Sequence, residues 1–142
     1  MKTVTLFSDA TALKNVGPGG YGTILSYNNK ERILRGGTFD TTANKMELLG
    51  VIEGLRMLKE PCEVEIVTKS IYVAKGIEVW LDRWIARGFT KVKNLALWQE
   101  YLMAAREHKI KVTQIQTNVG YEACEHCDQI AQEEAQRFNK QL

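Results

Sequence analysis

The sequence contains no apolar run near the roughly 20 residues that a membrane-spanning helix needs. It also has no Asn-x-Ser/Thr acceptor for glycosylation, and its opening MKTVTLFSDA alternates like a β-strand and lacks a signal-peptide pattern. We therefore expect a cytoplasmic protein that does not contact a membrane. The net charge is only +2, so any basic surface for nucleic acid has to come from local clustering.

Cysteine and histidine are scarce as well. The three cysteines are an odd number, which without a secretory signal predicts reduced thiols. Cys124 and Cys127 form a C-x-x-C pair around His126, but a zinc site needs about four ligands and no second C-x-x-C is present. The segment ACEHCDQIA is typical of a helix start, which places both cysteines on one side. We favour a thiol pair over a metal or redox site.

The chain is long enough for one domain over residues 1–142, because 142 residues with a hydrophobic share of 44% can build a core. Alternating residues predict strands, and helical spacing from Thr42 onward predicts helices. The expected strands are 2–8, 21–27, 32–39, 63–68 and 110–116, with turns at 17–20 and 28–30. The expected helices are 42–61, one or two within 70–86, one around Leu95–Ala105, and 121–138.

This order of elements, β-β-β-α-β-α-β-α, predicts an α/β fold. Two crossovers long enough to hold helices favour parallel pairing later in the chain, whereas the early strands follow one another through short turns. The expected architecture is a five-stranded mixed sheet, with its first three strands antiparallel and helices flanking it.

Four segments contain the charged residues that could form a catalytic or metal-binding site. They read FSDATALKNVGPGGYG, TTANKMELLG, IVTKSIYV and ACEHCDQIA, and they contain Asp9, Glu47, Lys69 and Asp128 respectively. In this order and spacing they resemble the four motifs of a type 1, bacterial ribonuclease HI-like ribonuclease H, an enzyme that cuts the RNA strand of RNA–DNA hybrids. The resemblance covers nearly the whole chain and implies the ribonuclease H-like fold.

The resemblance implies a magnesium-dependent hydrolysis. Two Mg²⁺ ions about 4 Å apart activate water and stabilise the leaving oxygen, and such hard cations bind carboxylate oxygens. By position in the motifs, Asp9 is the bridging ligand, Glu47 belongs to the leaving-group ion, and Asp128 belongs to the water-activating ion.

The chain departs from the family at the remaining carboxylate. The family has a Thr-Asp-Ser triplet at a strand end, and this chain has Thr68-Lys69-Ser70. A protonated lysine has no lone pair for a metal and repels a dication. We expect the Lys69 ammonium to pair with Asp9 or Glu47, and Mg²⁺ binding at Asp9, Glu47 and Asp128 to be weak or lost.

A second departure concerns a family histidine before the last helix that assists proton transfer or product release. Alignment on Gly120 and Cys127-Asp128 puts Asn118 at its position, and asparagine cannot shuttle protons near neutral pH. We therefore predict that hydrolysis is strongly impaired or absent.

The resemblance also implies residues that contact a hybrid. Ala12, Ala43 and Ile71 stand where polar or thiol-bearing side chains are usual, and Trp80 with Trp84 begins a reduced basic handle that continues through Phe89 and Lys93. Core packing is the competing interpretation for at least one of the two tryptophans. The predicted nucleic-acid-binding residues are Lys14, Asn15, Asn44, Trp80, Arg83, Trp84, Arg87 and Lys91.

Three functions remain open from the sequence. The leading hypothesis is a non-catalytic homologue, a pseudoenzyme that keeps weak binding to RNA–DNA hybrid or other nucleic acid. The alternative is an active nuclease with one metal at Asp9 and Asp128, in which Lys69 serves as a fixed cation for the leaving group. A third is a protein-interaction module without nucleic-acid affinity. A monomer is expected in each case.

Overall fold

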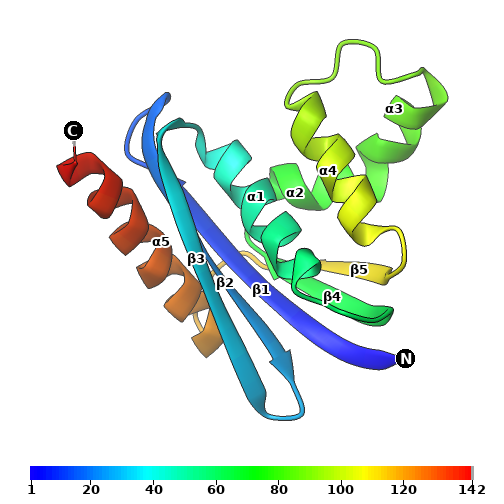
Figure 1. Cartoon of the computed structure of the whole chain (residues 1–142), viewed down its shortest axis with the longest axis horizontal. Helices are drawn as coiled ribbons and strands as arrows, with labels where there is room; N and C mark the ends of the chain where they lie inside the picture. Colours follow the sequence, from blue (N-terminus) through cyan, green and yellow to red (C-terminus); the bar gives the residue numbers. More distant parts are fainter. Residues whose placement is uncertain (142) are drawn as a thin grey trace.

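The computed structural model describes residues 1–141 and contains one five-stranded sheet in the order β3-β2-β1-β4-β5 (Figure 1). The strands are β1 (Lys2–Ala12), β2 (Gly17–Tyr27), β3 (Lys30–Thr41), β4 (Cys62–Thr68) and β5 (Lys109–Gln114). β1, β2 and β3 pair antiparallel, whereas β4 runs parallel to both β1 and β5. The predicted fold class is confirmed.

The helices fill the predicted places with altered bounds. They are α1 (Ala43–Arg56), α2 (Ile71–Lys75), the π-helix η1 (Gly76–Trp80), α3 (Leu81–Ala86), α4 (Leu95–Ala105) and α5 (Glu122–Lys140). The segment expected to hold one or two short helices therefore contains three consecutive helical elements, α2, η1 and α3, which follow one another without a break from Ile71 to Ala86. No helix of residues 1–141 is apolar over a length that would cross a membrane.

The first hairpin shows one correct and one wrong turn prediction. Asn28 and Asn29 have φ of 50° and 62°, the left-handed backbone that a tight hairpin turn requires, and they connect β2 to β3 as predicted. Residues 17–20 are not a turn but the start of β2. Gly20 lies under α5, where an added Cβ would be 2.5 Å from the Glu134 Cβ, so glycine serves close packing there.

Helix α1 begins as predicted and ends early. The Thr42 hydroxyl accepts the Lys45 N–H at 3.3 Å, which confirms Thr42 as the N-cap. The helix ends at Arg56 rather than near Pro61, because Met57 and Leu58 donate to carbonyls only three residues back and tighten the last turn. The chain then turns into β4.

Helices cover both faces of the sheet (Figure 1). On one face, α1 and α4 pack over a core that includes Leu6, Ile52, Ile66 and Trp98, all with 0% exposure. On the other face, α5 crosses β1, β2 and β3. This arrangement brings the start of α5, the helix that contains Asp128, close to the ends of β1 and β4.

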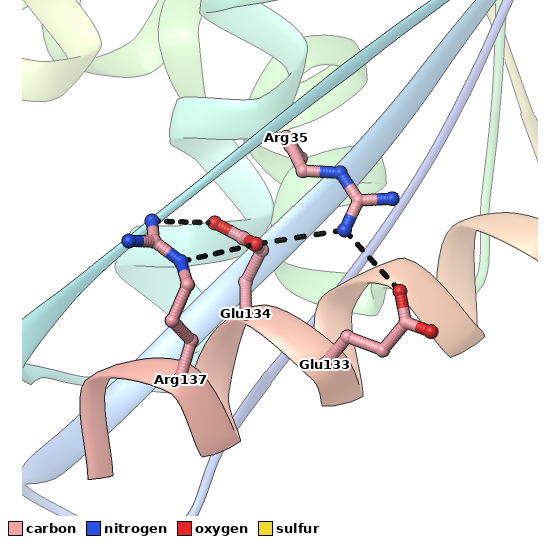
Figure 2. A network of polar contacts seen from close by, with 4 residues as sticks. All are labelled: Arg35, Glu133, Glu134 and Arg137. Atoms are coloured by element: carbon pink, nitrogen blue, oxygen red, sulfur yellow. Dashed lines mark hydrogen bonds and ion pairs between the residues drawn. The ribbon is translucent and has the colours of Figure 1, made fainter. Parts of the chain in front are cut away.

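A polar network fastens α5 to the edge strand β3 (Figure 2). The buried Glu134 accepts from Arg137 at 2.9 Å and lies 3.6 Å from the guanidinium of Arg35, which also contacts Glu133 at 3.2 Å. A buried carboxylate is stable only when its oxygens are satisfied, and Arg137 from the same helix contributes to this. Arg35 comes from β3, so its contacts with Glu133 and Glu134 connect the helix to that strand.

Candidate functional site

The register of β1 and β4 brings Asp9 and Lys69 together. The two parallel strands pair up to Phe7 and Val67, and Asp9 and Lys69 each follow two residues later on the same face of the sheet. The Lys69 Nζ lies 3.3 Å from the Asp9 Oδ2. The predicted ion pair is confirmed, and its partner is Asp9.

Asp9 is satisfied from within the protein. Its side chain is only 6% exposed, and its Oδ1 accepts the Ala10 N–H at 2.9 Å. The Asn118 amide, from the segment between β5 and α5, donates to the Asp9 Oδ2 at 3.5 Å. The substitutions of the family's fourth carboxylate and of its histidine, Lys69 and Asn118, therefore converge on one carboxylate oxygen. The other amide atom, Asn118 Oδ1, is buried without a hydrogen-bond partner.

The electrostatics of the site favour a reduced negative charge. Burial raises the pKa of Asp9, the Ala10 N–H and Lys69 act against that shift, and the charge of Asp128 adds to it. Burial, followed by the nearby charge of Asp9, raises the pKa of Glu47 well above its ordinary value of 4.5. Two of the three inherited carboxyls are thus biased toward the neutral form.

Asp9, Glu47 and Lys69 line one open cleft, and Asp128 does not line it. Asp128 lies in α5, is partly buried, and is near enough for its charge to raise the pKa of Asp9 and Glu47. The remaining wall contains Ile71, whose side chain is 61% exposed in the cleft.

The side chains present do not fit the two magnesium ions that the family motifs imply. Within residues 1–141, no group of three or more His, Cys, Asp or Glu side chains is arranged to hold a metal ion. Both Asp9 oxygens already have partners within the protein, since Oδ2 contacts the Lys69 ammonium and the Asn118 amide nitrogen and Oδ1 accepts the Ala10 N–H. A lysine in place of the fourth carboxylate offers no ligand atom and adds positive charge.

The C-x-x-C pair does not offer metal ligands at the surface. Cys124 and Cys127 are free and buried, whereas His126 is exposed. Burial raises the pKa of Cys124 to about 11 and also raises that of Cys127. Both thiols therefore stay protonated near neutral pH and pack as small apolar side chains.

Two further hollows neighbour the cleft and share lining residues with it. One is lined by Lys14, Asn15 and Asn44, and it shares Asn44 with the cleft. The other lies against the handle and shares Tyr72 with the cleft. The residues of this second hollow are Tyr72, Trp80, Trp84, Lys91, Val92 and Lys93. We call these three neighbouring hollows, whose lining residues extend from Lys14 to Lys93, the trough. Arg83 and Arg87 lie exposed on α3 and just beyond it.

The tryptophans of the handle belong to an aromatic cluster. Trp84 packs against the core and against Trp98, with ring centroids 5.3 Å apart, and Trp80 stacks on Trp84 at 5.9 Å. Trp84 therefore follows the core-packing interpretation, whereas Trp80 is partly buried and lines the hollow.

Tyr72 was not among the predicted binding residues. Its hydroxyl accepts hydrogen bonds from Asn94 at 3.0 Å and from Trp98 at 2.8 Å, and the residue lines both the cleft and the hollow beside the handle. The sequence signal that could have pointed to Tyr72 is its position three residues after Lys69, at the start of a helix, which places it near the same cleft.

The sheet order β3-β2-β1-β4-β5, with α1 and α5 on opposite faces and acidic side chains on β1, α1 and α5, is that of the ribonuclease H fold class. The family description "RNase H" matches residues 1–136. A ribonuclease H of Sulfurovum sp. (strain NBC37-1) is 49% identical over 141 residues, covering 99% of this chain and 96% of the relative. The chain belongs to the ribonuclease H family.

Solved structures agree with this assignment. LC9-RNase H1, described as a type 1 RNase H with the type 2 active-site motif, superposes with a TM-score of 0.87 at 27% identity, over 95% of this chain and 72% of that one. LC11-RNase H1, solved in complex with an RNA/DNA hybrid, shares the fold at a TM-score of 0.64 and 18% identity, over 94% of this chain and 97% of that one.

Proposed function

We propose that this chain is a ribonuclease H homologue that binds RNA–DNA hybrids and does not cleave them by two-metal hydrolysis. The observation that carries the proposal is the 3.3 Å contact between the Lys69 Nζ and the Asp9 Oδ2, which puts a cation where the family's metal chemistry needs a ligand. The Lys69 ammonium would then balance the charge of the Asp9 carboxylate, as a bound magnesium ion is expected to do in an intact family member.

The trough supports the binding half of the proposal. It carries lysines at both ends and in the middle, with asparagine and tyrosine groups between them. Lysines interleaved with aromatic side chains favour a nucleic-acid backbone over an apolar ligand. Because only a few of these cations reach phosphates, we expect weak, salt-sensitive affinity with a shallow slope, corresponding to about three to five contacts.

Two measurements on the unmodified protein test this function. A salt titration of binding to a fluorescent RNA–DNA hybrid is expected to give a measurable affinity at low salt and the shallow slope described above. A cleavage assay with Mg²⁺ on the same hybrid is expected to give product far below that of an intact ribonuclease H run beside it.

Other results assign other functions. Vigorous Mg²⁺-dependent cleavage would support a nuclease with one metal at Asp9 and Asp128, in which Lys69 stabilises the leaving group. No binding at low salt would support a protein-interaction module. Sedimentation of the same sample checks the expected monomer.

A further inference from the structure

The Lys69 side chain contacts a buried carboxylate and is also partly exposed to the cleft. Its Nζ contacts Asp9 inside the protein, yet 36% of its side chain remains exposed in the cleft. An ammonium carries three N–H donors, and Asp9 is its one carboxylate partner within residues 1–141. Donor capacity is therefore left over, and it lies at the middle of the trough.

We propose that the Lys69 ammonium is a resident cation that binds a phosphodiester oxygen of the nucleic acid, so that hybrid binding by this chain needs no divalent ion. The inference rests on the proposed hybrid binding and names the atom and the ligand class at its centre. Lys69 then supplies the positive charge that the phosphate meets in this cleft.

The surroundings of Lys69 favour this arrangement. The same cleft exposes Ser70 and Asn44, whose polar groups suit a phosphate or sugar, and Lys14 lies in the adjoining hollow. The Asp9 carboxylate, which would otherwise repel a phosphate, is paired with the ammonium at 3.3 Å, and Asp128 does not line this cleft. A phosphate entering this cleft meets a compensated site without any added metal.

The test measures affinity for a short fluorescent RNA–DNA hybrid in EDTA and in Mg²⁺ at matched ionic strength. For the unmodified protein, Mg²⁺ is expected to leave the affinity the same or lower, since added dications compete for phosphates. Lys69→Met is expected to weaken binding about fivefold to tenfold and to reduce the salt slope by about 0.9, the equivalent of one phosphate contact.

A charge-matched variant separates phosphate binding from simple neutralisation of Asp9. Lys69→Met combined with Asp9→Asn removes one positive and one negative charge, so the net charge of the cleft is unchanged. We expect this double variant to keep the weakened affinity and the reduced slope. Lys59→Met removes an exposed lysine just before β4, at the opposite end of that strand, and is expected to leave both values unchanged.

Two outcomes would overturn the inference. One is a double variant that binds with the affinity and salt slope of the unmodified protein, which would mean that Lys69 only neutralises Asp9. The other is an affinity that EDTA abolishes and Mg²⁺ restores. Failure of the proposed function is distinct from both, because then the unmodified protein either does not bind hybrid or cleaves it.

Discussion

Lys69 and Asn118 lie far apart in the sequence and direct nitrogen atoms at the same oxygen, Asp9 Oδ2, at 3.3 Å and 3.5 Å. One comes from the end of β4 and the other from the segment before α5. Lys69 replaces the family's fourth carboxylate, and Asn118 replaces its histidine. The two departures therefore act on one atom, and together they satisfy a buried carboxylate without a metal.

Replacing the lysine with the family's carboxylate should restore metal binding more than activity. Lys69→Asp supplies a ligand and removes a repelling charge, so calorimetry is expected to detect Mg²⁺ binding that the unmodified protein lacks. Hybrid cleavage is expected to stay low, because Asn118 cannot transfer a proton and Ile71 leaves an apolar group in the cleft.

Adding Asn118→His to Lys69→Asp should raise cleavage further. Lys69→Asn is the matched control, since it removes the positive charge without providing a carboxylate. Two tight Mg²⁺ sites in the unmodified protein would show that the Lys69 ammonium does not exclude the metal ions.

The ion pair should be visible in thermal stability. Lys69→Met leaves the buried Asp9 carboxylate without its cation, and we expect the midpoint of unfolding to fall by about 2–4 °C, which corresponds to roughly 1 kcal/mol in a domain of this size. Asp9→Asn alone should raise the midpoint, because burial already disfavours the charged carboxyl and raises its pKa.

The double-mutant cycle measures the coupling between the two side chains. In the Asp9→Asn background, Lys69→Met is expected to cost little or nothing, as followed by circular dichroism at neutral pH. Equal losses in both backgrounds would show that Lys69 stabilises the fold through its alkyl stem rather than its charge.

Stability should depend on pH through Glu47. Its pKa is raised in the folded state, so its contribution to the free energy of unfolding is fully present below the unfolded value and is lost as pH rises through the folded value. Between the ordinary value of 4.5 and the raised value, the slope of stability against pH is therefore expected to be negative for this group.

Glu47→Gln should remove that component and raise stability near neutral pH. Urea unfolding over a pH series tests both statements, with Glu53→Gln on the same helix as a partly exposed control. Curves of the same shape for Glu47→Gln and the unmodified protein would mean that Glu47 is solvated in solution.

The basic handle should carry much of the affinity. Charge reversal of Arg83, Arg87 and Lys91 to glutamate is expected to abolish hybrid binding, because each change removes a cation and adds a repelling charge. Asp9→Asn is expected to leave affinity unchanged or slightly higher in the same anisotropy assay. Equal losses from both changes would indicate binding through a metal at Asp9.

The sequence was sufficient to predict the elements and their order. Alternation in the strands, the Asn28-Asn29 turn and the Thr42 cap are local signals, since each depends on neighbours within a few residues, and all three agree with the structure. The motif spacing likewise led to the family and to the substituted positions, Lys69 and Asn118.

Tertiary structure decided what those residues contact. The sequence left Asp9 and Glu47 as equal partners for Lys69, and the parallel register of β1 and β4 selected Asp9. Residues 17–20 carry turn-forming types, yet packing of α5 against Gly20 made them a strand. The pKa of Glu47 depends on burial between elements. Each of these outcomes depends on contacts between distant segments, and such contacts exist only once the sheet and helices have packed together.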